Sequence, residues 1–216
     1  MMLNIPKFSL KPETMTHELI GKISGAIVLL SGIIYMRQII QRRVHPNFAS
    51  WCIWALIGGA VWINYKTSGA TDNAWVAFFG MTNPVVIAIL AFFYEKRVWP
   101  DRTEVICLML GLISITIWWF MEKRGAEIAL YVAIFADLCA AFPTARLFRK
   151  EPWQDRPLMW ILFALGFGLA MFAIPDDGQN LANYALPVYM VTMSSVLAWF
   201  LVRYRIKNKD PFSEWY

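Results

Sequence analysis

A single aspartate in the middle of an apolar stretch carries the most informative chemistry in this sequence. Asp137 lies between Ala136 and Leu138, within the stretch 128–147. An ionised carboxylate in such surroundings is costly, so it must face a polar interior, a partner or water, or else carry a proton. Asp137 is therefore a candidate proton-coupling group. A hydrogen-bonded acid that only fixes helix packing is the alternative.

A second polar pair stands within another apolar stretch. Thr82 and Asn83 directly precede Pro84, near the middle of 74–94. An amide can donate to and accept from a solute that carries hydroxyl or charged groups. We therefore expect Asn83, with Thr82 beside it, to bind substrate.

Tryptophan provides flat surfaces on which a sugar or aromatic ring can stack. Trp54 and Trp160 are the candidates for this role, and Trp51 shares a helix face with Trp54 because the two are three residues apart. Core packing or anchoring at the membrane interface is the alternative for all three.

Three prolines fall inside apolar stretches, where each removes an amide donor from a helix. Pro84, Pro143 and Pro187 are therefore candidate hinges, although such kinks can also simply shape a bundle.

Long apolar stretches must position these residues. Of the 216 residues, 58% are hydrophobic and 16% are charged, and the mean hydropathy is +0.47. A helix of about 20 residues spans the hydrocarbon core of a bilayer. We predict an all-α membrane protein with seven transmembrane helices, of which the fourth and sixth are the shortest. The predicted spans are 20–39, 48–65, 74–94, 104–121, 128–147, 158–174 and 181–202.

The distribution of Lys and Arg predicts the orientation, because positively charged loops stay in the cytoplasm. One side collects 14 of these residues and the other 6, which places the N-terminus outside and the C-terminus in the cytoplasm. The 14 are Arg37, Arg42, Arg43, Lys96, Arg97, Arg102, Arg146, Arg149, Lys150, Arg156, Arg203, Arg205, Lys207 and Lys209. The 6 are Lys7, Lys11, Lys22, Lys66, Lys123 and Arg124. Membrane lipids rather than nucleic acid are the partners that this charge pattern implies. Trp and Tyr near the span ends, including Trp51 and Tyr65, fit an interfacial belt.

Short motifs recur between the first and second halves of the chain. Tyr35-Met36-Arg37 is followed by Pro46 and, eight positions later, by Trp54; Thr144-Ala145-Arg146 is followed by Pro152 and, again eight positions later, by Trp160. Asn83-Pro84-Val85 is answered by Leu186-Pro187-Val188. These matches predict two parallel three-helix units, at 1–103 and 126–216, joined by an inverting linker helix at 104–125.

The sequence resembles the SWEET and PQ-loop superfamily of small transporters, and within it a group of small bacterial membrane proteins. The resemblance rests on the 3+1+3 arrangement, on Tyr35-Met36-Arg37, on the segment from His45 to Trp54, and on Asp137 with Phe142-Pro143-Thr144. It implies a proton-coupling role for Asp137, a substrate-binding role for Asn83, and location in a bacterial inner membrane. The Pro-Gln pair of PQ-loop proteins is replaced by Ile34-Tyr35 and Pro143-Thr144.

The sequence therefore favours a secondary transporter or facilitator of a small polar solute, sugar-like or vitamin-like, that works by alternating access. Transport with and without proton coupling are both left open. A non-transporting accessory subunit of a larger membrane complex is the alternative, and a homo-oligomer is also left open. P-loop, HExxH and GxSxG motifs are absent, so we expect no enzyme. Cys52, Cys107 and Cys139 have no metal-type spacing, and we expect neither metal nor cofactor.

Overall fold

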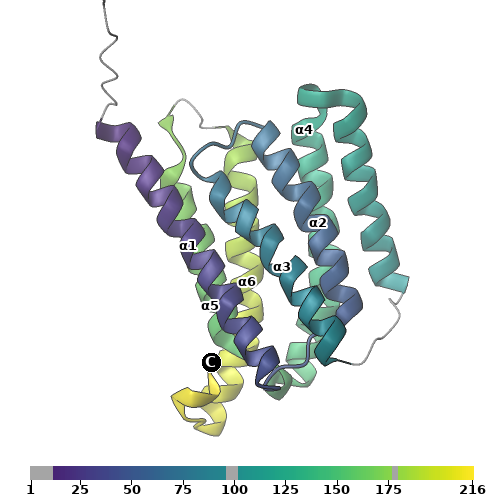
Figure 1. Cartoon of the computed structure of the whole chain (residues 1–216), viewed down its shortest axis with the longest axis vertical. Coiled ribbons are helices and arrows are strands. Elements are labelled where there is room, and N and C mark those ends of the chain that lie inside the picture. Colours follow the sequence, from purple (N-terminus) through teal and green to yellow (C-terminus); the bar gives the residue numbers. More distant parts are fainter. Residues whose placement is uncertain (1–11, 96–101, 177–179) are drawn as a thin grey trace, which may run out of the picture.

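The computed structural model describes residues 12–95, 102–176 and 180–216, and all regular elements in these ranges are helices (Figure 1). Lys7, Lys11, Lys96 and Arg97, which the charge count used, lie outside them, and the side chains of Lys123 and Arg124 are not described. The α-helices are α1 (Pro12–Ile40), α2 (Phe48–Thr67), α3 (Ala74–Tyr94), α4 (Arg102–Lys150), α5 (Pro157–Ala170) and α6 (Leu181–Asn208). Short 3-10 helices are η1 (Pro152–Gln154), η2 (Met171–Ala173) and η4 (Phe212–Glu214).

Five helical segments among the described residues are long and apolar enough to cross a bilayer. They are Thr16–Ile40, Phe48–Thr67, Ala74–Tyr94, Gly125–Lys150 and Leu181–Asn208. Two further apolar helical segments, Val105–Phe120 and Pro157–Ala173, are shorter, and they correspond to the two spans that the sequence predicts to be the shortest. By length and composition, the chain is a multi-pass helical membrane protein.

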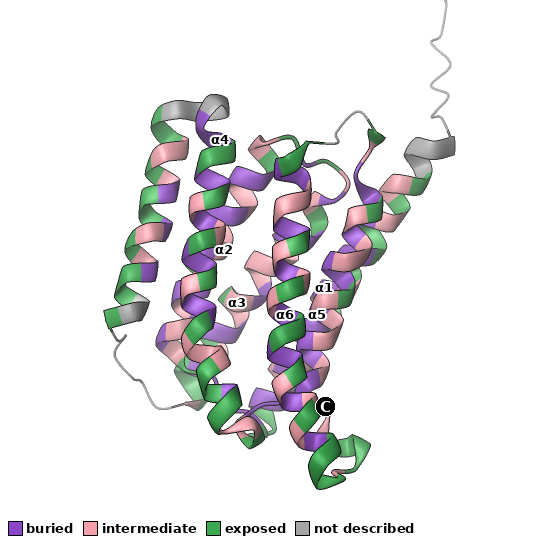
Figure 2. Cartoon of the chain, turned by 180° about the vertical axis from the view of Figure 1, so that it is seen from behind, coloured by how far each residue is buried: buried purple, intermediate pink, exposed green. Residues whose placement is uncertain are grey.

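Large apolar side chains lie on the surface of the bundle as well as in its core, and several polar side chains are buried. Phe93 and Phe120 are 73% and 80% exposed, whereas Asn64 and Ser194 are fully buried. Exposed residues run along the outer faces of the helices, and buried residues face between them (Figure 2). Large apolar side chains can face lipid without cost, and polar groups gain from partners inside the bundle. This pattern supports the membrane assignment independently of helix length.

The helix ends follow from local sequence. Asn47 begins α2, and its side chain accepts a hydrogen bond from the Ala49 amide at 2.9 Å. Asn180 begins α6 in the same way, accepting from the Asn183 amide at 2.8 Å. Lys209 ends α6 in the left-handed conformation. Side-chain acceptors at these positions satisfy amides that a helix start otherwise leaves unpaired.

The prolines predicted as interruptions lie inside helices without ending them. Pro84 is in α3, Pro143 in α4 and Pro187 in α6. A proline in a helix interior kinks the helix when packing compensates for the missing hydrogen bond. Whether these three positions act as hinges stays a prediction.

The helix α4 folds back on itself and contributes two antiparallel arms (Figure 1). The Ser114 hydroxyl on the first arm donates to the Ala129 carbonyl oxygen on the second at 2.8 Å. The predicted linker at 104–125 and the predicted fifth span are thus parts of a single assigned helix. The proposed boundary at residue 125 stays a prediction.

In the first half of the chain, α3 packs against both α1 and α2, and in the second half α6 packs against both α5 and α4. Between the halves, α1 packs against α5, and α2 packs against α4. Close approach of α1 to α3 depends on Gly32, because a Cβ at this position would overlap the side-chain amide of Asn83. This order of packing brings α2, α3, α4, α5 and α6 around a common centre.

Candidate functional site

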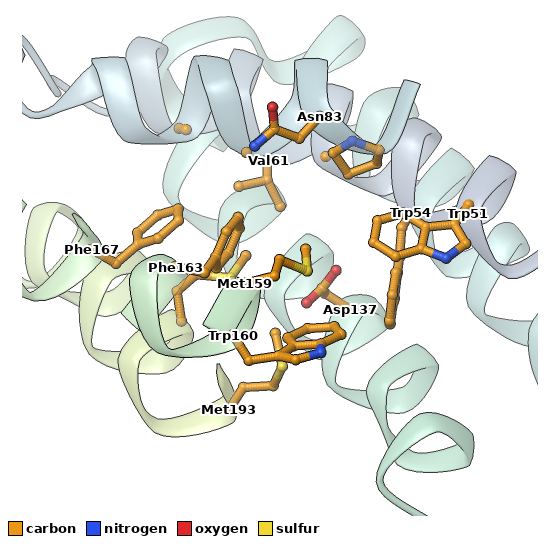
Figure 3. Close-up of a pocket in the computed structure, with 15 residues that line it drawn as sticks. Trp51, Trp54, Val61, Asn83, Asp137, Met159, Trp160, Phe163, Phe167 and Met193 are labelled. Atoms are coloured by element: carbon orange, nitrogen blue, oxygen red, sulfur yellow. The ribbon is translucent and has the colours of Figure 1, made fainter. Parts of the chain in front are cut away.

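Five helices enclose a small central cavity with a volume of about 50 Å³ (Figure 3). Six of the residues singled out from the sequence line it: Trp51 and Trp54 from α2, Asn83 and Pro84 from α3, Asp137 from α4 and Trp160 from α5. A cavity of this size holds a few water molecules. Residues from both halves of the chain, separated by more than 100 positions, therefore meet at one place.

Asp137 is the polar centre of this cavity. Its Oδ2 atom accepts a hydrogen bond from the Tyr189 hydroxyl on α6 at 2.6 Å, and the residue is 7% exposed. In Figure 3 the carboxylate lies among Trp54, Met159 and Trp160. Within the described residues, no Lys, Arg or His forms an ion pair with it. A carboxylate in these surroundings must hold a proton or receive a positive charge from elsewhere.

Asn83 lines the cavity, but its amide is used for helix packing. Its Nδ2 atom donates to the Val28 carbonyl oxygen on α1 at 2.7 Å, and its Oδ1 atom is buried without a hydrogen-bond partner. Figure 3 shows this oxygen pointing away from Asp137. The hydroxyl of Thr82 donates to the Phe78 carbonyl oxygen within α3 at 2.8 Å, and Thr82 is not among the lining residues. A substrate-binding role for either residue stays a prediction.

Aromatic rings form a continuous series beside the carboxylate. Trp51 and Trp54 are in edge contact with ring centroids 4.9 Å apart, and Trp54 meets Trp160 at 6.1 Å. The structure brings Trp54 and Trp160 together, whereas a stacking role for them stays a prediction. The assignment of Trp51 and Tyr65 to the interfacial belt is wrong. Trp51 is 4% exposed and Tyr65 is fully buried, because both side chains face neighbouring helices rather than lipid.

A larger cavity, of about 330 Å³, lies at the end of the bundle that carries the C-terminal segment. Trp51, Trp54 and Trp160 line both cavities, so these rings separate the central cavity from the larger one. The larger cavity reaches the surface beside the exposed His45 and Asn47. Its volume falls in the range of small-ligand sites. We call it the outer cavity.

A second buried carboxylate, Asp155, lines the outer cavity. Its Oδ2 atom accepts from the Tyr35 hydroxyl at 2.8 Å, and its Oδ1 atom accepts from the Arg156 amide at 2.6 Å. Burial raises the pKa of Asp155 to about 6, because desolvation outweighs these hydrogen bonds. Arg205 donates to the Asp155 carbonyl oxygen at 3.1 Å, and Arg156 pairs with Glu214 at 2.8 Å. The loop before α5 is thereby tied to α1, α6 and the C-terminal segment.

The opposite end of the bundle is closed by uncharged groups. The Tyr65 hydroxyl donates to the Asn183 carbonyl oxygen at 2.7 Å and accepts a hydrogen bond from Asn73 Nδ2. Each of the three residues is at most 1% exposed. The network joins the end of α2, the α2–α3 loop and the start of α6. We call it the tyrosine seal.

The proline positions differ in their relation to the cavities. Pro84 lines the central cavity and Pro143 the outer cavity, whereas Pro187 is buried in α6 and lines neither.

Sequence reasoning missed Tyr189, Asp155 and the tyrosine seal. Tyr189 lies two residues after Pro187 in an otherwise apolar stretch, which was a usable signal. Asp155 gave little signal, because a charged residue between two membrane helices is ordinary. Asp155 lies against Tyr35 of α1 and Arg205 of α6, both distant in sequence.

No protein-family model matches the chain, and neither curated proteins nor solved structures give a match.

Proposed function

We propose that the chain is a secondary carrier for a small solute that works by alternating access and couples to protons through Asp137. One observation carries this proposal. A carboxylate that has no cationic partner among the described residues faces a central cavity, and three tryptophans separate it from a larger cavity that reaches the surface. Acids inside membrane helices commonly mark proton relays and solute pathways, and Asp137 faces a cavity although one of its oxygens is bonded to Tyr189.

The carrier would contain seven membrane-crossing helices arranged as two three-helix units, 1–103 and 126–216, with 104–125 as the linker. The packing order supports this, since α3 contacts both other helices of its unit and α6 does the same in the second. Each unit would move as a body against the other. We further propose an inner membrane of bacterial type, with the N-terminus outside and the C-terminus in the cytoplasm.

Two parts of the molecule would act as gates in this cycle. On the side of the outer cavity, the contact between Trp54 and Trp160 would open to admit solute. On the other side, the tyrosine seal would break when the outer cavity closes. Protonation of Asp137 would remove the charge that makes passage through an apolar interior costly.

Solute flux in proteoliposomes tests the proposal. We would load vesicles containing the purified full chain with a pH-sensitive dye and follow proton movement and uptake of labelled glucose and nicotinamide riboside, with and without a pH gradient. We expect uptake of at least one solute, accelerated by the gradient, and loss of the acceleration in Asp137→Asn. Asp176→Asn, at an exposed position outside both cavities, is the matched control. Uptake that remains equally driven by pH in Asp137→Asn would contradict the coupling role. A protein that extracts only in an obligate complex and transports neither solute would favour the accessory-subunit alternative.

A further inference from the structure

The charges along the path from the surface to the centre have one sign. Among the described residues that line the two cavities, Asp137 and Asp155 are the acids, and neither Lys nor Arg is present. His45 is the one imidazole, and its Nδ1 atom lies 3.1 Å from Glu95 Oε1, so it is paired with an acid at the rim. Asp137, which forms no ion pair among the described residues, gives the central cavity a negative potential that concentrates cations, whereas Arg205 near Asp155 offsets part of the charge at the outer cavity.

The apolar lining also suits a positive charge. Trp54 and Trp160 present aromatic rings to the central cavity, and three methionines, Met159, Met190 and Met193, complete its wall. Aromatic faces attract cations through the ring quadrupole, and thioethers are polarisable and adapt to ligand shape.

Recognition of a sugar would need several donors and acceptors in fixed positions. The central cavity offers few, since the Asn83 amide donates to α1 and one oxygen of Asp137 is bonded to Tyr189. The polar lining is therefore poor in groups that read hydroxyls and rich in groups that hold positive charge.

We infer that the solute is a small organic cation with a flat apolar body, bound at Asp137 in exchange for a proton. The inference rests on the proposed carrier function and names the class of its substrate. The neutral carboxylic acid gives up its proton to water, and the resulting carboxylate pairs with the cation. The site thus has the same net charge when protonated and when loaded, so its apolar surroundings never hold an uncompensated charge.

Few other ionisable groups can compete with Asp137 for this role. Tyr189 faces it from α6, and Cys139 lies two residues further along α4. The residues that α2, α3 and α5 contribute to the central cavity do not titrate. A proton exchanged at this cavity is therefore assigned to Asp137.

The size of the central cavity requires a movement during binding. Its volume of about 50 Å³ is smaller than a flat ring with a cationic head, so the edge contact between Trp54 and Trp160 must open. The ring would then lie against these indoles, with its charge directed to Asp137. Tryptophan fluorescence should report this change.

Benzamidine and benzamide provide a matched pair of probes, because the two have nearly the same shape and only benzamidine is charged at neutral pH. We would titrate each into the purified full chain in detergent and follow tryptophan fluorescence and heat. We expect benzamidine to bind at least tenfold more tightly than benzamide. We also expect its affinity to rise with pH, with up to one proton released per molecule bound at the acidic end. Equal binding of the two probes, or pH-independent binding of benzamidine, would overturn the inference without any variant.

Three variants locate the site. Asp137→Asn should abolish the preference for benzamidine, whereas Asp176→Asn, at an exposed position outside both cavities, and Asp155→Asn should retain most of it. Circular dichroism would check that each variant is folded. A preference that survives Asp137→Asn and disappears in Asp155→Asn would overturn the assignment to Asp137.

Flux measurements separate this inference from the proposed function. Uptake of glucose without benzamidine binding would leave the carrier standing and overturn the cation class. Benzamidine binding that depends on Asp137, without flux of benzamidine or of either earlier solute, would leave the cation site standing and overturn the carrier.

Discussion

The two ends of the bundle use a buried tyrosine in opposite ways. At one end the Tyr35 hydroxyl donates to the Asp155 carboxylate, and a cavity of about 330 Å³ remains beside the pair. At the other end the Tyr65 hydroxyl bonds to Asn183 and Asn73, all three almost wholly buried. A carboxylate keeps a demand for further donors or water, whereas neutral amide and carbonyl groups can satisfy one another completely. The difference teaches that the two ends are distinguished by the chemistry of the group that the tyrosine contacts: a carboxylate at the end with the outer cavity, and neutral amide and carbonyl groups at the closed end.

Removal of one hydroxyl from the tyrosine seal should have the largest effect on stability. Tyr65→Phe leaves the Asn183 carbonyl and the Asn73 amide without this partner, and each buried orphan costs about 2 kcal/mol. We expect the free energy of unfolding to fall by about 4 kcal/mol, measured by denaturation in detergent micelles. Tyr184→Phe, at a half-buried tyrosine at the start of α6, is the control.

The same variant should also open the closed end to solvent. A cysteine introduced as Ala182→Cys, with Cys52, Cys107 and Cys139 replaced by serine, would be labelled with a thiol reagent that does not cross membranes. Tyr65→Phe should accelerate labelling of this buried position. Unchanged stability and unchanged labelling would show that the hydroxyl does not hold this end closed.

At the end with the outer cavity, the dominant effect should depend on pH. The pKa of Asp155 is raised from 3.8 to about 6, so the folded protein holds this proton more tightly than the unfolded chain does. The resulting stabilisation is fully present below about pH 4 and is lost as the pH rises through about 6, which amounts to about 3 kcal/mol. Asp155→Asn removes this titration; its single side-chain oxygen can still accept from the Arg156 amide, and its NH2 group can donate to the Tyr35 hydroxyl oxygen. Unfolding measured from pH 4 to pH 7 should favour the variant increasingly, and a difference that is constant with pH would contradict the assignment.

The smallest effect is expected from Tyr35, the tyrosine beside the outer cavity. Tyr35→Phe removes one hydrogen bond, and Asp155 keeps its bond from the Arg156 amide. We expect a loss of about 1 to 2 kcal/mol in unfolding free energy, larger at pH 7 than at pH 4 because hydrogen bonds to a charged acceptor are stronger. The double variant with Asp155→Asn should show the same loss at both pH values. If Tyr35→Phe proves costlier than Tyr65→Phe, the comparison between the two ends fails.

Much of the central site was predictable because its residues are unusual for their surroundings. Asp137 stands out in an apolar stretch, and it does line the central cavity together with Trp54 and Trp160. The direction of the Asn83 amide was not predictable, since it depends on the space that Gly32 leaves on α1. Similarly, Tyr35 and Asp155 are 120 residues apart, and no local pattern links them.

The sequence by itself determined that the chain forms apolar helices of membrane length, because hydrophobicity sustained over a span is a local property. It also determined which polar residues such helices would have to accommodate. The tertiary structure alone decided which way each helix faces. Stretches that are apolar on all sides do not specify their rotation, so close packing at Gly32 and hydrogen bonds such as Tyr189 to Asp137 must set it. For the same reason, only the packed bundle shows that one end holds a cavity and the other a tyrosine seal.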